Sequence, residues 1–107
     1  LLDWAEIFGR EAPVELELGI GKGRFLKESA HARPEHDFLG LEISRKWVND
    51  AKRRILKDPP PNLRLLCSEA QDFLERKVGD ASLAALHVYH PDPWPKRRHH
   101  RRRLLQR

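Results

Sequence analysis

The stretch Val14-Glu15-Leu16-Glu17-Leu18-Gly19-Ile20-Gly21-Lys22-Gly23 decides the fold of this chain. Its first five residues alternate between apolar and acidic side chains, which predicts a short strand. Its three glycines then predict a tight turn, because glycine adopts backbone conformations that other residues avoid. Apolar residues at helical spacing over 24–32, with Pro34 just beyond, predict a helix. The order is therefore strand, glycine turn, helix.

The same order repeats along the chain. Further strands are predicted at residues 37–43, 63–67 and 83–89, and a short helix or arm precedes the first strand. Ser44 is expected to cap a helix whose buried stripe is Trp47, Val48, Ala51 and Ile55. Another helix is expected to begin at Ser68 or Glu69. Strands alternating with helices predict an α/β fold, with a parallel sheet and helices on both faces.

Length and charge limit the function classes. The 107 residues predict a single domain, and a net charge of +5 favours nucleic acid or an anionic membrane surface as partner. Residues 96–107 hold seven Lys and Arg and no acid, so the rest of the chain has 14 basic and 16 acidic residues. The positive charge is therefore local.

Cysteine content and hydropathy suggest where the protein works. Cys67 is the only cysteine, which excludes an internal disulfide framework and favours a reducing compartment. There is no signal peptide pattern and no apolar run long enough to span a bilayer. We expect a cytoplasmic protein with no membrane partner and no metal ion. The sequence does not indicate the oligomeric state. Four strands make a small core, so residues 1–107 are expected to be a partial domain, truncated after about four strands.

The glycine turn is a candidate ligand site. A dinucleotide fingerprint requires glycine at position 24, where this chain has Arg24, and the spacing does not fit a Walker loop. Glu17, two residues before Gly19, suits a nucleoside that carries an amino acid, because such a ligand has an ammonium group and no pyrophosphate. The alternative is a plain tight turn without a ligand.

Acids at the ends of the next two strands support the ligand interpretation. Glu42 lies about 20 residues beyond the glycines, where a carboxylate can accept hydrogen bonds from ribose hydroxyls. Glu69 follows the third strand, where an acid can accept from an adenine amine. The alternatives are an exposed acid at position 42 and ordinary helix capping at Ser68 and Glu69.

The stretch His90-Pro91-Asp92-Pro93-Trp94-Pro95-Lys96 follows the last predicted strand. Three alternating prolines prevent the strand from continuing, because proline has no amide donor and a fixed φ. Asp92 is therefore held just past a strand end, which is where open α/β sheets bind ligands. The basic run that follows predicts contact with a polyanion, and its alternative is a solvated tail.

Four segments together resemble the bacterial tRNA (guanine-N7-)-methyltransferase family. They are Glu17–Leu26, Phe38–Glu42, Asn62–Arg64 and, most specifically, Pro91–His99. The resemblance covers nearly the whole chain and implies a Rossmann-like class I methyltransferase fold. It also implies S-adenosylmethionine as methyl donor and N7 of a guanine in the tRNA variable loop as acceptor.

The resemblance also implies roles for individual residues. The donor site would comprise Glu17, Gly19, Gly21, Gly23, Glu42, Glu69, Ala70 and Asp92. Asp92 would also be catalytic, Lys96 would contact substrate, and Arg98, His99, His100, Arg101, Arg102 and Arg103 would bind RNA. The chain departs from the family at Glu69, where Asp is usual, and at His90, where Phe is common.

The implied reaction requires little catalytic apparatus. Guanine N7 has an exposed lone pair and no proton, so it can attack the methyl group without a general base. Asp92 could orient the guanine and stabilise the positive charge that develops on it. The competing function is a non-catalytic RNA-binding subunit or remnant that keeps the methyltransferase fold.

Overall fold

A computed structural model describes residues 2–79 and 82–88 of the chain. Helices and strands alternate along it, and the order of elements is α1 (Trp4–Phe8), β1 (Val14–Leu18), α2 (Arg24–Ala32), β2 (Asp37–Glu42), α3 (Arg45–Ile55), β3 (Leu63–Cys67), α4 (Ala70–Lys77) and β4 (Ala85–Val88). This is the α/β order that the sequence predicts.

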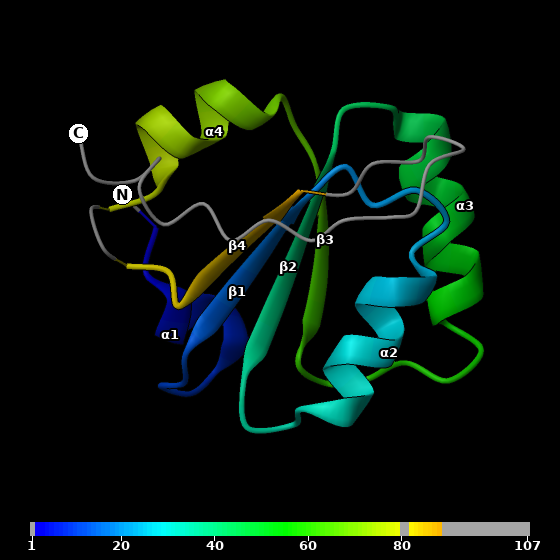
Figure 1. The fold of residues 1–107 in the computed structure, drawn as a ribbon, viewed down its shortest axis with the longest axis horizontal. Coiled ribbons are helices and arrows are strands. Elements are labelled where there is room, and N and C mark those ends of the chain that lie inside the picture. Colours follow the sequence, from blue (N-terminus) through cyan, green and yellow to red (C-terminus); the bar gives the residue numbers. More distant parts are fainter. Residues whose placement is uncertain (1, 80–81, 89–107) are drawn as a thin grey trace.

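The four strands form one parallel sheet in the order β3-β2-β1-β4 (Figure 1). From β1 the chain moves outward to β2 and then β3, and it next crosses back to place β4 on the other side of β1. The direction of the connections therefore reverses beside β1. Ligands of open α/β sheets bind at the carboxyl ends of the strands next to such a reversal, and the glycine turn follows β1 at this point.

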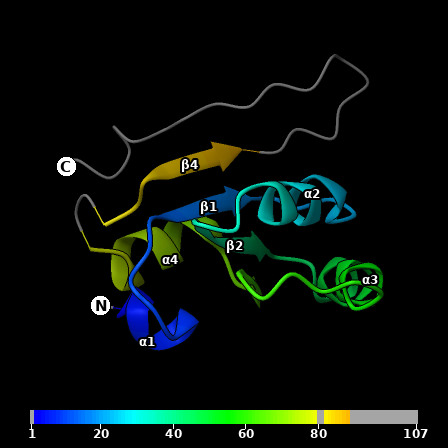
Figure 2. The same cartoon turned by 90° about the horizontal axis from the view of Figure 1, so that it is seen from below.

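The helices cover both faces of the sheet, as predicted (Figure 2). Right-handed crossovers put α2 and α3 on one face and α4 on the other, because the chain changes direction after β3. The core on the α1 and α4 side consists of Val14, Leu16, Leu39, Leu41, Phe73, Val78, Leu83 and Leu86. The core on the α2 and α3 side consists of Ile20, Leu26, Ala30, Phe38, Ala51, Ile55 and Leu63. Within the described residues, no helix is long and apolar enough to cross a membrane.

Capping residues fix where the helices begin. The Asp3 side chain accepts hydrogen bonds from the amides of Ala5 and Glu6 at the start of α1. The Ser44 hydroxyl accepts from the amide of Trp47 at the start of α3, at 3.3 Å, as the sequence predicts. Each cap satisfies amides that have no partner inside their own helix.

Three sequence predictions differ from the structure, and one of them extends beyond the described residues. Trp47 is not buried with the rest of its stripe, because its side chain is 45% exposed. The second strand ends at Glu42, and Ile43, predicted as its last residue, is 69% exposed. The last strand is shorter than predicted, since Leu83 lies before it, and residue 89 lies outside the described residues.

Gly40 makes close packing between β2 and α2 possible. A Cβ at this position would lie 2.5 Å from Cδ2 of Leu26, 2.7 Å from Cγ2 of Ile20 and 3.1 Å from Cδ2 of Leu65. These separations are shorter than van der Waals contact, so a side chain of any size at position 40 would push α2 and the glycine turn away from the sheet.

We predict that Gly40→Ala lowers the free energy of unfolding by about 1–3 kcal/mol through overpacking. Leu26→Ala, which creates space at the same place, should offset part of that loss when the two are combined. Urea denaturation of both single variants and the double variant measures this coupling. Strictly additive losses would contradict the packing account.

Candidate donor and acceptor site

The turn after β1 is shaped by its glycines. Gly19, Gly21 and Gly23 have φ values of 73°, 56° and 80°, a region that side-chain-bearing residues rarely adopt. The Gly19 amide donates to the carbonyl of Leu41 at 2.8 Å, and the Gly23 amide donates to the carbonyl of Ile20 at 2.9 Å. The turn therefore closes on itself and on β2, and its backbone faces the carboxyl end of the sheet.

Gly23 also brings α3 against this turn. A Cβ at Gly23 would lie 3.0 Å from Cβ of Ala51 and 3.4 Å from Cδ1 of Ile55. These contacts are tighter than ordinary packing, so glycine favours the close approach of α3, which follows Glu42 at the end of β2. The sequence predicted a tight turn or a ligand cradle here; the geometry shows a turn fixed from two sides.

Glu42 ends β2 beside the glycine turn. It is largely buried, and its Oε2 atom accepts a hydrogen bond from the Ser44 amide at 3.0 Å. The Glu42 carbonyl accepts from the Ser68 amide at 3.1 Å, which joins this strand end to the next. Among the described residues no hydrogen-bond partner is found for Oε1 of Glu42, so one carboxylate oxygen remains for a ligand.

Glu69 caps α4. Its Oε1 accepts from the amide of Gln71 at 2.6 Å and its Oε2 from the amide of Asp72 at 3.0 Å, so both carboxylate oxygens serve the helix. This is the capping role that the sequence left open as the alternative. Ala70 is the first residue of α4 and is half-buried.

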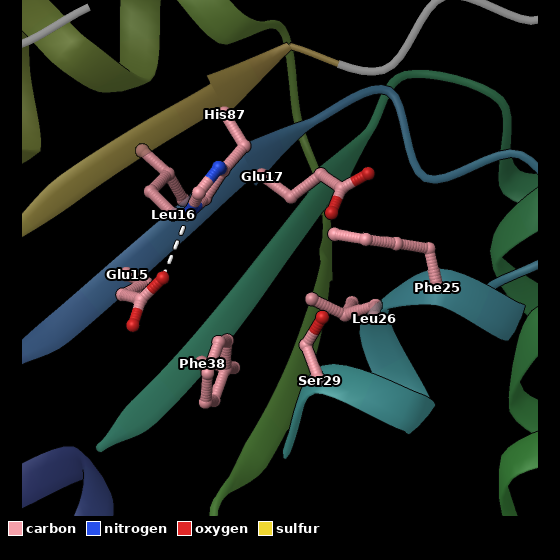
Figure 3. Close-up of a pocket in the computed structure, with 8 residues that line it drawn as sticks. All are labelled: Glu15, Leu16, Glu17, Phe25, Leu26, Ser29, Phe38 and His87. Carbon is pink, nitrogen blue, oxygen red and sulfur yellow. Dashed lines mark hydrogen bonds and ion pairs between the residues drawn. The ribbon is translucent and has the colours of Figure 1, made fainter. Parts of the chain in front are cut away.

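Glu17 is enclosed within the protein. It lines a pocket between the sheet and α2, where its carboxylate extends toward Phe25 (Figure 3). The pocket has no room for a water molecule, and Glu17 is only 2% exposed. Of the three acids predicted at strand ends, Glu42 is buried but has one oxygen that no described residue bonds, Glu69 is exposed but occupied as a cap, and Glu17 is buried.

Ile43 is a candidate site residue that the sequence missed. It follows Glu42, and its exposed side chain stands at the carboxyl edge of the sheet, where Cys67 donates to the Ile43 carbonyl at 3.4 Å. An isoleucine at this edge offers an apolar surface to a flat ring. The signal was its position directly after the acid, which the sequence also allows as the last residue of a strand.

Several predicted site residues lie outside the described residues. They are the predicted catalytic Asp92, the substrate residue Lys96, and the RNA-binding residues Arg98, His99, His100, Arg101, Arg102 and Arg103. Their roles stay predictions. Within the described part of the chain, no group of three or more His, Cys, Asp and Glu side chains is placed to hold a metal ion.

With this geometry in place, comparison with known proteins identifies the family. A family described as "Putative methyltransferase" matches residues 11–107. The chain belongs to this methyltransferase family.

Curated relatives support the same assignment. The chain is 46% identical over 105 residues to the tRNA (guanine-N(7)-)-methyltransferase of Bordetella pertussis, covering 98% of this chain and 41% of the relative. It is 45% identical to the enzyme of that name from Edwardsiella ictaluri (98% and 44% covered) and 42% identical to that from Vibrio vulnificus (99% and 44% covered). The chain therefore spans about two fifths of the length of these relatives.

Solved structures confirm the Rossmann-like methyltransferase fold. Precorrin-6y C5,15-methyltransferase from Geobacter metallireducens superposes with a TM-score of 0.64 at 16% identity, over 78% of this chain and 43% of that one. An antibiotic-related methyltransferase gives 0.65 at 20% identity, over 89% and 50%. PKMT2 from Rickettsia typhi, solved in complex with AdoHcy, gives 0.63 at 21% identity, over 78% and 16%.

A buried ionic cluster lies on the face of the sheet that α2 covers, toward the amino end of β1. Glu15 Oε1 accepts from His87 Nε2 at 2.8 Å and from Arg33 Nη2 at 3.0 Å, while its Oε2 contacts His36 Nδ1 at 2.6 Å (Figure 3 shows the His87 contact). The cluster ties β4 to β1 and both strands to the end of α2. The sequence carried a signal for it, since His87 interrupts an otherwise apolar strand and Glu15 lies two residues from Glu17.

Burial by itself acts to raise the pKa of Glu15. The hydrogen bonds from His87 and His36 and the charge of Arg33 outweigh burial, so the pKa of Glu15 falls below its ordinary value of 4.5. A carboxyl group whose pKa is lowered on folding contributes stability above its unfolded pKa, and that contribution is lost as the pH falls through the folded pKa.

We predict that Glu15→Gln lowers the free energy of unfolding by about 1–3 kcal/mol at neutral pH, because His36, His87 and Arg33 lose their charged partner. The variant should also lose less stability than the unmodified chain between about pH 5 and about pH 3, since its position 15 no longer titrates. Urea denaturation across that range measures both effects. Glu28→Gln, on the exposed face of α2, is the matched control and should follow the unmodified chain. Identical pH profiles for Glu15→Gln and the unmodified chain would refute this role.

Proposed function

We propose that this chain carries the donor site of an enzyme that transfers a methyl group from S-adenosylmethionine to N7 of a guanine in the variable loop of tRNA. The observation that carries the proposal is the fixed glycine turn beside Glu42, whose Oε1 has no hydrogen-bond partner among the described residues. The names and 42–46% identity of the curated relatives support the acceptor. The chain spans about two fifths of their length, so the activity of the complete enzyme is stated here as a proposal. A cytoplasmic location is also part of it.

The residues present fit a nucleoside donor. The backbone of Gly19 and Gly21 lets a ligand approach without side-chain interference, and Glu42 Oε1 would accept a hydrogen bond from a ribose hydroxyl. Ile43 would pack against the purine, and the bond from the Ser68 amide to the Glu42 carbonyl places Glu69 and Ala70 beside this strand end. When bound, S-adenosylmethionine supplies a methyl group on a positively charged sulfur.

Glu17 has an indirect role in this proposal. Its carboxylate is buried directly before the glycine turn, so it would stabilise the shape of the turn and contribute negative charge toward the ammonium group of the donor. Glu69 would likewise act by fixing the start of α4, since both of its carboxylate oxygens accept from helix amides.

The acceptor side of the proposal uses the sequence after β4. Asp92 would accept hydrogen bonds from the guanine and stabilise the positive charge that N7 attack places on the ring. Lys96 would contact substrate, and Arg98 to Arg103 would bind the RNA backbone. No proton has to leave N7, so positioning supplies most of the rate enhancement, an effect that reaches about 7–11 kcal/mol in well-oriented systems.

Isothermal titration calorimetry tests the donor site. We predict that S-adenosylmethionine binds the chain and that Glu42→Ala weakens binding about ten- to a hundredfold, because a hydrogen bond to a charged group is lost. Glu35→Ala, an exposed acid before β2 at the opposite end of the sheet, is the control and should bind normally.

Methyl transfer to an unmodified tRNA transcript tests the reaction. N7-methylguanosine should form, detected as mass of the released nucleoside, and Asp92→Ala should abolish it. Donor binding without methyl transfer would locate the missing requirement on the acceptor side, whereas RNA binding without donor binding would favour the non-catalytic RNA-binding alternative. A folded chain that binds no donor would refute the proposed donor site.

A further inference from the structure

Trp47 occupies an unusual place for a tryptophan. Its neighbours on the inner stripe of α3, Val48, Ala51 and Ile55, are buried, yet the Trp47 side chain is 45% exposed. Ala51 faces Gly23, and Trp47 lies one helical turn nearer the start of α3 than Ala51. Trp47 therefore lies exposed in the first turn of α3, which begins at the carboxyl edge of the sheet.

Three cations lie near Trp47 in the sequence or on the turn that α3 packs against. Arg45 and Lys46 precede it in α3, and Lys22 lies in the glycine turn against which α3 packs. All three are exposed, and within the part of the chain that the structure describes no carboxylate forms an ion pair with any of them. Arg53, farther along the same helix, is by contrast paired with Asp50.

Helix stability does not account for these cations. The first turn of α3 contains no acid, and positive side chains at the start of a helix oppose its dipole. The tryptophan does not add to the core either. The four side chains therefore fit contact with something outside the described residues.

A flat apolar ring among unpaired cations matches the chemistry of unpaired RNA. Aromatic side chains stack on exposed bases, and Lys and Arg contact the phosphates that join those bases. A target guanine that leaves its stack exposes the faces of neighbouring bases. The exposed apolar side chains near α3 are few, since Ile43 lies two residues before the helix and Leu56 directly after it, so the apolar area is small for a stable protein interface.

We propose that Trp47, with Lys22, Arg45 and Lys46, forms an RNA-stacking surface beside the donor site, separate from the basic residues 96–107. Trp47 stacks on an unpaired base next to the target guanine, and the three cations contact the phosphates of the RNA backbone on either side of that base. The identity of the RNA as the methyl acceptor rests on the proposed function; binding of unpaired RNA does not.

Fluorescence anisotropy with a labelled single-stranded RNA of about 12 nucleotides tests the proposal. With the full chain, Trp47→Ala should weaken binding about tenfold, while Trp47→Phe, which keeps a stacking ring, should keep most of the affinity. Arg45→Ala with Lys46→Ala should flatten the slope of log affinity against log salt by about 1.4, the value for two lost phosphate contacts.

The same helix supplies the controls. Leu56→Ala removes an exposed apolar side chain, and Lys52→Ala with Lys57→Ala removes two exposed cations from farther along and just beyond α3. Both should leave RNA affinity and its salt slope unchanged. Calorimetry with S-adenosylmethionine should give the same affinity for Trp47→Ala as for the unmodified chain, because Trp47 contacts RNA and not the donor.

Four results would overturn the proposal. They are no RNA binding by the unmodified chain, equal affinities for Trp47→Ala and Leu56→Ala, loss of donor binding in Trp47→Ala, and a change in self-association in Trp47→Ala without a change in RNA affinity. The last result would assign the ring to contact between copies of the chain. Failure of the proposed function is seen separately, as absence of donor binding in the unmodified chain.

Discussion

The contact between Gly23 and Ala51 is the constraint on which the candidate site depends. Gly23 has a φ of 80°, which strains any residue with a side chain, and a Cβ there would lie 3.0 Å from Cβ of Ala51. This contact presses α3 against the glycine turn. It thereby sets the glycine backbone, the Glu42 carboxylate and the Trp47 ring at one edge of the sheet. A larger residue at position 23 would strain the turn and push against α3.

The two ends of the sheet use their polar groups differently. At the amino end, Arg10 donates to Asp37 Oδ1 at 2.7 Å and to the carbonyls of Pro34 and His36, and Asn62 donates to three carbonyls. These contacts are internal and stabilise the fold. At the carboxyl end, Glu42 keeps an available oxygen among the described residues. Glu42 and the glycine turn therefore lie where the chain reverses direction beside β1.

Much of the fold follows from local sequence signals. Alternation in Val14–Leu18, the glycines after it and the Ser44 cap predict β1, the turn and α3, because each depends on neighbouring residues alone. The position of Glu42 at a strand end was predictable for the same reason.

The rest depends on contacts between distant segments. Trp47 is on the correct stripe for burial, yet it is exposed, one helical turn before the Ala51 that packs on Gly23. Glu15 meets His87, 72 residues away, through the pairing of β1 with β4, which no local pattern defines. Both possible roles of Glu69 fit its sequence, and the structure shows the capping contacts.

The central claim is that a nucleoside donor binds at the carboxyl edge formed by the glycine turn and the end of β2. Amide chemical shifts in a ¹H–¹⁵N NMR titration with S-adenosylhomocysteine test it most directly. The account predicts the largest changes at Gly19, Gly21 and Ile43 and none at Asn62, which lies at the amino end of the sheet. Changes centred on the amino end, or a folded spectrum that the compound leaves unaltered, would contradict it.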